Sequence, residues 1–281
     1  MRRITTGLVL MGALIVATPC FAQGEKTNEQ AEEKTYEQQA DKNKAQPEES
    51  QEPQVLYSST FWKKGSNTID GTYKVVERPD GVRVLILGKN FRTKEGPDLK
   101  IVLSQRTFDK VTRKNVLDGG LVLGSLKSNK GLQEFAIPDN IKLDQYKSIA
   151  IHCEKYTKLW GAAPLLKGEV MASGAKWTKK TKSTKGRYEI VQRAGYLYIR
   201  FSPDFKTPKP PEPLRILLSP LDTKAASNKN AENCAVFVAL LRKTKGSQEY
   251  RLPDGIDLSD FRSVHLNCKK YTKLWSTAPI S

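Results

Sequence analysis

The chain contains an internal repeat, which limits what it can fold into. Residues 131–165 read GLQEFAIPDNIKLDQYKSIAIHCEKYTKLWGAAPL, and residues 246–280 read GSQEYRLPDGIDLSDFRSVHLNCKKYTKLWSTAPI. The two segments align without a gap at an offset of 115, and seventeen of the thirty-five positions are identical. The sequence therefore predicts two tandem domains, 55–168 and 169–281, each of a size that usually forms one small core.

Within each copy the apolar residues alternate with a period of two. Segments such as VRVLILG, LKIVLS, LQEFAIP and KSIAIHC are rich in β-branched residues and are separated by Pro-Asp-Gly, Gly-Gly and Lys-Gly breaks. Short alternating segments of this kind are typical of antiparallel sandwiches and barrels. Only LDQYKS and LSDFRS, just before the cysteine strands, favour a helical turn. The predicted fold class is all-β, with two tandem antiparallel β-sandwich or barrel domains from an internal duplication.

The first residues have the pattern of an export signal. Arg2 and Arg3 precede an apolar run over 4–17, and a Cys-Phe-Ala sequence ending at Ala22 offers small residues to a signal peptidase. Residues 1–22 thus predict a secretory signal peptide, too short for a stable transmembrane span. We expect an exported protein, either periplasmic or extracellular, for which association with the envelope is an alternative. We expect no transmembrane segment in the mature chain.

A polar segment follows the predicted signal. Residues 23–54 are dominated by Glu, Gln and Lys and have no apolar period. Such a segment cannot bury enough surface to offset its ordering entropy, so it predicts a disordered acidic spacer. A short solvated helix around 28–42 is the alternative.

The two predicted domains are strongly basic. The whole chain carries a net charge of +17, and residues 55–281 alone carry +20 because the spacer is acidic. This charge favours anionic partners: acidic glycans, lipid headgroups, wall polymers or extracellular nucleic acid. The alternative is a solvated surface that like charge keeps soluble. No motif for specific nucleic-acid recognition stands out.

Motifs of the common hydrolases and nucleotide-binding enzymes are absent from the sequence. There is no Gly-x-Ser-x-Gly, no Gly-x-Gly-x-x-Gly and no P-loop. The two histidines, His152 and His265, are not repeated and alternate with the apolar strand face, so we expect both to point outward. No zinc or copper site is predicted, and a classical enzyme is not expected.

A cysteine ends the same strand segment in both copies. In SIAIHC, Ile149, Ile151 and Cys153 share the apolar face, and Cys268 takes the corresponding place. Two interpretations stay open, because a buried cysteine packs as a small apolar residue and an exported thiol can serve redox chemistry. A third cysteine, Cys234, belongs to the second copy alone. A disulfide between Cys234 and Cys268 would leave Cys153 as the sole thiol of the mature chain.

With these residues each copy resembles an electron-transfer DM-13 domain. The pattern comprises Gly-Pro-Asp-Leu before a strand, a Leu-Lys step, a Gly-x-Gln-x-aromatic-x-apolar-Pro segment, and apolar-x-Cys-x-x-aromatic closed by Ala-Pro-Leu. The first copy matches it at 96–99, 126–127, 131–138 and 151–165, and the second, less closely, at 211–214, 241–242, 246–253 and 266–280.

The resemblance implies a β-rich extracellular module that transfers electrons through its cysteine. The cysteine would act as a bare thiol or as the ligand of a prosthetic group such as haem; the sequence leaves the cofactor unknown, haem or none. Carried onto this chain, the role falls on Cys153 and Cys268. A supporting aromatic motif, expected to pack in the core or at its rim, consists of Tyr156, Trp160, Tyr271 and Trp275.

Two functions therefore compete. The first is electron transfer with a redox partner protein through the repeated cysteine. The second is a non-catalytic basic module that binds anionic cell-envelope or matrix polymers. Because the first copy keeps Gly-Pro-Asp-Leu at 96–99 and has no second cysteine, we expect thiol or cofactor chemistry at Cys153. The second copy carries a net charge of +11, against +9 for the first, and is expected to have a structural or adhesive role.

Overall fold

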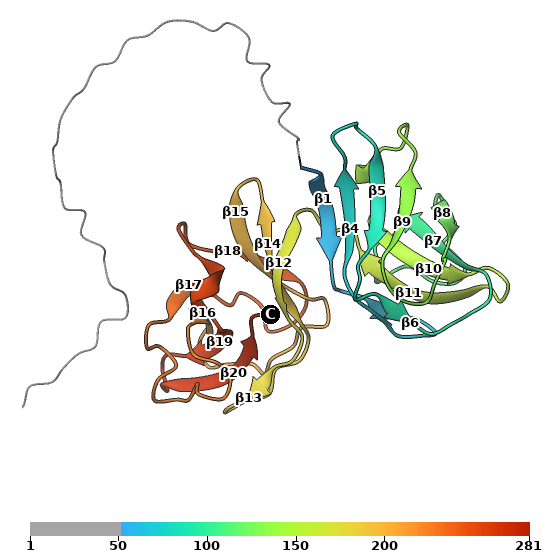
Figure 1. Ribbon diagram of the computed structural model, residues 1–281. Helices are drawn as coiled ribbons and strands as arrows, with labels where there is room; N and C mark the ends of the chain where they lie inside the picture. The colour runs from blue at the N-terminus through green and yellow to red at the C-terminus, as the bar shows by residue number, and fades with distance from the viewer. Residues whose placement is uncertain (1–51) are drawn as a thin grey trace, which may run out of the picture. The chain divides into compact units, whose positions relative to one another are not determined.

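Antiparallel strands build both repeats within residues 52–281, the part of the chain that the computed structural model describes. The predicted signal and nearly all of the predicted spacer lie outside the described residues. Figure 1 shows two sheets in each repeat. In the first repeat, one sheet has, in spatial order, β1 (Gln54–Ser59), β4 (Tyr73–Glu77), β5 (Arg83–Leu87) and β9 (Gln133–Ile137). The other has β2 (Lys63–Lys64), β11 (Lys158–Pro164), β10 (Ser148–Cys153), β7 (Leu99–Ser104) and β8 (Leu121–Ser125), and a small ribbon joins β3 (Ile69–Asp70) to β6 (Arg92–Thr93).

The second repeat has the same strand order. Its first sheet consists of β12 (Glu169–Gly174), β14 (Tyr188–Arg193), β15 (Tyr196–Phe201) and β18 (Gln248–Arg251). Its second consists of β13 (Thr178–Lys179), β20 (Lys273–Pro279), β19 (Ser263–Cys268), β16 (Arg215–Ser219) and β17 (Val236–Leu240). The predicted single turns before the cysteine strands are the 3₁₀ segments Leu143–Gln145 and Leu258–Asp260. The prediction of an all-β, tandem antiparallel fold is confirmed.

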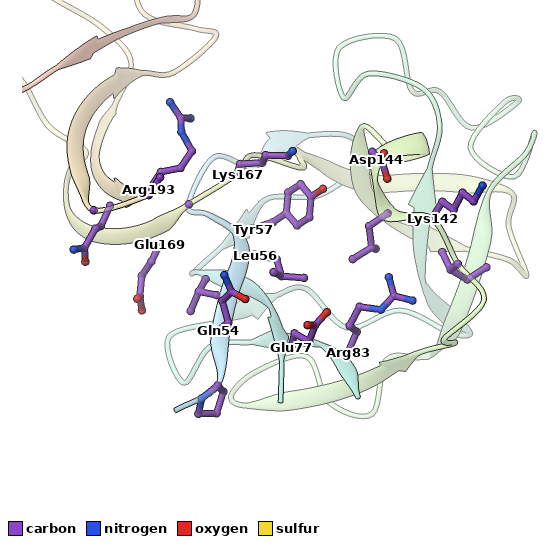
Figure 2. Close-up of a pocket in the computed structure, with 18 residues that line it drawn as sticks. Gln54, Leu56, Tyr57, Glu77, Arg83, Lys142, Asp144, Lys167, Glu169 and Arg193 are labelled. Atoms are coloured by element: carbon purple, nitrogen blue, oxygen red, sulfur yellow. The ribbon is translucent and has the colours of Figure 1, made fainter. Parts of the chain in front are cut away.

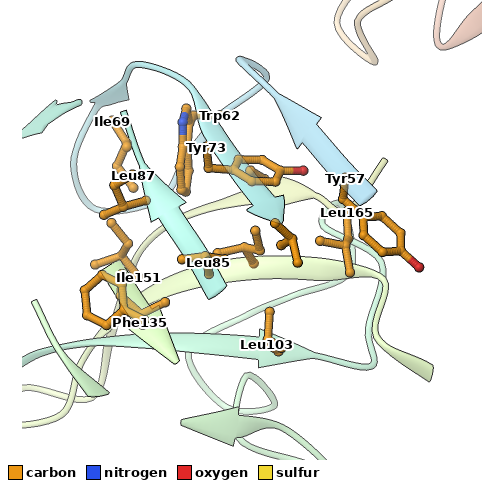
Figure 3. Packing of buried hydrophobic residues seen from close by; sticks show 14 of the residues in the cluster. Tyr57, Trp62, Ile69, Tyr73, Leu85, Leu87, Leu103, Phe135, Ile151 and Leu165 are labelled. Carbon is orange, nitrogen blue, oxygen red and sulfur yellow. The ribbon is translucent and has the colours of Figure 1, made fainter. Parts of the chain in front are cut away.

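The inner faces of the two sheets form the main core of each repeat. Alternation along β9 buries Gln133, Phe135 and Ile137 and exposes the residues between them. Figure 3 shows Phe135 with Leu85, Leu87 and other side chains of this core. Burial of such side chains supplies the main driving force for folding, at about 25 cal/mol per Å² of apolar surface.

A second, smaller core covers the outer face of the cysteine-bearing sheet. In the first repeat, Val111 and Val116, from the segment between β7 and β8, pack against Val102, Ala150 and Ala162. In the second repeat the corresponding cluster consists of Ala226, Ala231 and Leu274. This cover buries every residue of β10 and of β19, on both faces.

The cover corrects the expectation for the two histidines. His152 and His265 lie on the face opposite the cysteines, as predicted, but both are buried. His265 contacts Ser263 Oγ at 3.0 Å and the carbonyl oxygen of Ala231 at 3.1 Å. Burial lowers the pKa of His265 to about 4, and it also lowers the pKa of His152. The reason is that a long loop, and not solvent, faces the outer side of the sheet.

The segment between the repeats pairs with β1. Ser58 N donates to Leu166 O at 3.0 Å, and Gly168 N donates to Leu56 O at 3.2 Å. Ser58 Oγ adds a bond of 2.8 Å to Gly168 O. Since β1 also pairs with β4, both of its edges are hydrogen-bonded. Among residues 52–281, no helix has the length and apolar character that crossing a membrane requires.

A buried ion pair of the second repeat contacts the end of β1. Arg200 Nε donates to Glu189 Oε2 at 2.6 Å, and their side chains are only 5% and 0% exposed. Glu189 Oε1 accepts from Ser59 Oγ at 3.0 Å and from Thr60 Oγ1 at 2.7 Å. Arg200 Nη2 donates to Ser58 O at 2.6 Å. We call Glu189 and Arg200 the seam ion pair, because they join the two repeats.

Candidate functional site

Cys153 is the last residue of β10 and faces the main core. It is fully buried with Ile149 and Ile151, as the period of two predicts. Its Cα lies opposite Leu99 on β7, and its Sγ donates to Pro97 O at 3.0 Å. The thiol is free, and the backbone directly above it belongs to a loop. The sulfur is therefore shielded from solvent while lying next to the rim of the sandwich.

The loop over Cys153 is held by three contacts. Asp98 has a left-handed backbone conformation, with φ of 52°, and its carbonyl accepts from Glu154 N at 3.0 Å. Its carboxylate lies 2.8 Å from Lys100 Nζ. Gly96 is pressed against Trp160, because a Cβ there would lie 2.7 Å from two ring atoms of the indole. These contacts hold residues 94–98, which we call the cover loop.

Trp160 supports the cover loop from below. The indole is buried, and its Nε1 donates to Lys94 O at 3.1 Å. Outside the loop lies a surface depression of about 670 Å³, lined by residues 95–97, 99 and 126–129.

Cys268 occupies the corresponding place in the second repeat. It is fully buried and free at the end of β19. Its Sγ lies 3.8 Å from Glu212 Oε1, and the same oxygen accepts a hydrogen bond from Lys270 N. Trp275 is buried like Trp160. Cys268 is thus covered by a charged side chain, whereas Cys153 is covered by backbone.

The two tyrosines of the supporting motif do not join the cysteines. Tyr156 and Tyr271 are both 55% exposed. Tyr156 lies beneath the ammonium groups of Lys155 and Lys158, at 5.7 and 5.9 Å from its ring centre. The structure therefore brings together the cysteine and the tryptophan of each motif and leaves the tyrosine at the surface.

One interpretation of the cysteines is wrong. The sequence left open a disulfide between Cys234 and Cys268, but Cys268 is a free thiol buried in the core. Cys234 lies half-buried at a turn before β17, with φ of 52°. The thiol of Cys268 instead faces the loop that carries Glu212.

The comparisons with known proteins match both repeats. The family model described as electron transfer DM13 matches residues 60–165 and again residues 176–280. The chain belongs to the electron transfer DM13 family. In the comparisons with curated proteins and with solved structures, nothing matched the chain.

Haem does not fit the cysteines of these DM13 domains as they are folded. An axial sulfur ligand needs an open side toward the iron, but Cys153 is fully buried and its sulfur faces Pro97 O. Cys268 is equally enclosed. Within residues 52–281 no group of three or more His, Cys, Asp and Glu side chains is arranged to hold a metal ion. We therefore derive no step through haem.

Sequence reasoning missed the seam ion pair of the DM13 tandem. Glu189 corresponds to Lys74 of the first domain and Arg200 to Ile86, so both positions depart from the repeat. This departure was the available signal, because a charge on a mostly apolar strand needs a partner when it is buried. Lys74 itself forms an exposed pair with Glu169 at 2.5 Å.

A wide depression lies beside β1, away from the cysteines. Figure 2 shows the side chains that line it, among them Leu56 and Tyr57 of β1, Arg83 of β5 and Arg193 at the end of β14. Its volume is about 800 Å³. The charged side chains around it are of both signs: Glu77, Arg83, Lys142, Asp144, Lys167, Glu169 and Arg193. Neither Cys153 nor Cys268 lines this depression, and its charges are of both signs, so we give it no part in the candidate site.

Proposed function

We propose that this chain is an exported electron-transfer protein whose redox-active group is the thiol of Cys153. The observation that carries the proposal is a free, repeated cysteine at the end of a strand, whose sulfur contacts the backbone of the cover loop. Membership of the electron transfer DM13 family supports electron transfer in general terms. The thiol assignment and export are our own, the latter resting on the signal pattern of residues 1–22.

Opening of the cover loop is the first step of the proposed reaction. The bond from Cys153 Sγ to Pro97 O breaks, and Gly96 separates from Trp160. Loops of this kind open locally at a lower cost than global unfolding. The thiol then reaches solvent, where it loses its proton to water and becomes nucleophilic.

The second step is thiol–disulfide exchange with a partner protein that carries a disulfide. The sulfur of Cys153 attacks one sulfur of that disulfide and forms a mixed disulfide, while the other partner sulfur leaves as a thiolate. Cys153 is thereby oxidised, the leaving sulfur of the partner is reduced by the same electron pair, and attack of that partner thiolate or of another thiol on the mixed disulfide releases Cys153. No metal or further oxidant is required.

The surroundings of the two sulfurs make Cys153 a better candidate than Cys268 for the redox-active thiol. A depression of about 670 Å³ adjoins the loop over Cys153 and leaves room for that loop to move. The sulfur of Cys268 faces the carboxylate of Glu212, which also accepts a hydrogen bond from Lys270 N, whereas the sulfur of Cys153 faces a neutral backbone carbonyl. We therefore expect redox exchange in the first domain and a packing role for the cysteine of the second.

Glutathione disulfide provides a small probe of this assignment. The folded protein is incubated with it, and the adducts are located by intact-mass analysis and peptide mapping. We expect one adduct at Cys153, its loss in Cys153→Ser, and its retention in Cys268→Ser. An adduct that forms only after denaturation in urea would show that both cysteines merely pack, and an adduct at Cys268 alone would overturn the choice of domain.

Export has its own measurement. Expressed with its complete N-terminus in a bacterial host, the protein is expected outside the cytoplasm with Gln23 as its first residue, as N-terminal sequencing would report. Retention of Met1 on a cytoplasmic protein would contradict export without affecting the thiol assignment.

A further inference from the structure

Three lysines of the second domain lie side by side in one row. Lys185 and Lys206 exchange both backbone hydrogen bonds, at 2.8 and 3.1 Å. Lys206 is also paired with Lys245, between bonds of 2.8 Å from Thr207 N to Thr244 O and 2.9 Å from Gly246 N to Phe205 O. Directly paired residues of antiparallel strands point to the same face, about 5 Å apart. The three ammonium groups, which we call the lysine row, therefore line one surface at regular spacing.

The lysine row is unfavourable for the folded domain by itself. All three lysines are exposed, and within residues 52–281 no ion pair joins any of them to a carboxylate. Like charges placed opposite each other across strands destabilise a sheet. An anion bound along the row would remove this repulsion.

The first domain shows the same backbone arrangement with a different charge pattern. Asp70, Arg92 and Lys130 take the places of Lys185, Lys206 and Lys245. Arg92 Nε lies 3.5 Å from Asp70 Oδ2, so the first pair of that row is neutralised. The second domain has thus exchanged an internally compensated row for one with three free charges.

The surroundings of the row indicate which anion fits. The same three segments contribute further exposed lysines at Lys182, Lys209 and Lys243. The nearest carboxylate along the chain, Asp204, accepts a hydrogen bond from Ser202 Oγ at 2.5 Å. The exposed large aromatic side chains of residues 52–281 are Tyr156, Tyr196, Phe237 and Tyr271, none of which belongs to these segments. Binding of single-stranded nucleic acid relies on such stacking surfaces, whereas an acidic sugar chain needs regularly spaced cations.

We propose that the lysine row is a binding site for an acidic polysaccharide, with successive carboxylates lying along Lys185, Lys206 and Lys245. The site belongs to the second domain alone and is independent of any chemistry at Cys153. Lysine suits it because each ammonium group is a compact point charge that contacts one carboxylate without demanding a paired geometry. The second domain would hold the protein on a carboxylate-bearing matrix.

Polygalacturonate is the probe for the test. Its binding to the full chain is measured by titration calorimetry at about 50 mM salt, because exposed charges are only weakly screened at that concentration. Lys185→Asp, which copies the first domain, is expected to weaken binding roughly tenfold, because it removes one exposed ion pair with the polymer and places a repelling carboxylate in the row. The control Lys89→Asp makes the same charge change at an exposed site of the first domain and is expected to alter binding less than about twofold. Equal effects of the two variants would show that net charge alone binds the polymer and would overturn the site.

Two further measurements keep the test independent of folding. Lys185→Asp should melt no lower than the unmodified chain, because it removes repulsion, so weaker binding cannot result from loss of fold. Asp70→Lys should create a second row of three cations and raise the number of polymer sites. Preference for an oligothymidylate over polygalacturonate at equal salt would contradict the polysaccharide assignment.

Discussion

Replacing Glu189 by Gln removes the charge of the seam ion pair while keeping the shape of the side chain. The guanidinium of Arg200 would then stay buried, with a carboxamide in place of the carboxylate that its Nε contacts at 2.6 Å. Breaking a buried ion pair from one side costs about 3–5 kcal/mol. Arg200 retains its bonds to Ser58 O and Lys167 O, at 2.6 and 3.1 Å, so the lower end of this range, about 3 kcal/mol, is expected.

Thermal unfolding measures this loss. For folded units of 150–250 residues, 1 kcal/mol shifts Tm by about 2–4 °C, so Glu189→Gln should lower Tm by about 6–12 °C. Circular dichroism follows the loss of the sheets, and urea unfolding gives the free energy independently.

The duplication provides the control. Lys74, at the position that corresponds to Glu189, forms an ion pair with Glu169 in which both side chains are 38% exposed. Lys74→Gln should therefore cost less than about 1 kcal/mol, because solvent screens such a pair. If Glu189→Gln lowers Tm no more than Lys74→Gln does, the seam ion pair does not stabilise the protein in the way argued above.

Two more predictions concern buried groups of the two domains. Burial lowers the pKa of His265 from 6.5 to about 4. Between these two pH values the unfolded chain binds a proton at this histidine and the folded chain does not. The free energy of unfolding should therefore decrease by up to about 3 kcal/mol as the pH falls from 6.5 to 4. His265→Ala, which copies Ala150, should reduce this pH dependence in urea unfolding experiments. If the variant shows the same pH dependence, other groups cause it. Gly96→Ala should displace the cover loop from Trp160, because the new Cβ would lie 2.7 Å from the indole. The thiol of Cys153 should then be labelled faster in the folded protein. If the variant is labelled at the rate of the unsubstituted protein, this loop does not limit access to the thiol.

The sequence was sufficient for the features that depend on local alternation. A period of two in SIAIHC places Cys153 with Ile149 and Ile151, and the structure has all three on the inner face. The duplication then transfers this assignment to Cys268. Both results follow from strand geometry alone, which needs no knowledge of distant contacts.

Other features depended on contacts between segments far apart in the sequence. His152 and His265 are buried because the loop segments after β7 and β16 fold over the sheet. Those segments have no periodic apolar pattern from which this packing could be predicted. The contact of Cys153 with Pro97 joins residues 56 positions apart. Periodicity gives the face of a strand, but it does not say what lies on that face.

The seam also gives the two copies of one fold different roles in a shared contact. The first domain contributes hydroxyl groups at Ser59 and Thr60, where the second has Gly174 and Ala175. The second contributes the seam ion pair, whose equivalents in the first are Lys74 and Ile86. Each domain here carries only one of two complementary surfaces, so a tandem of two first domains would place Lys74 and Ile86 where the seam ion pair lies and would lose its contacts with the end of β1.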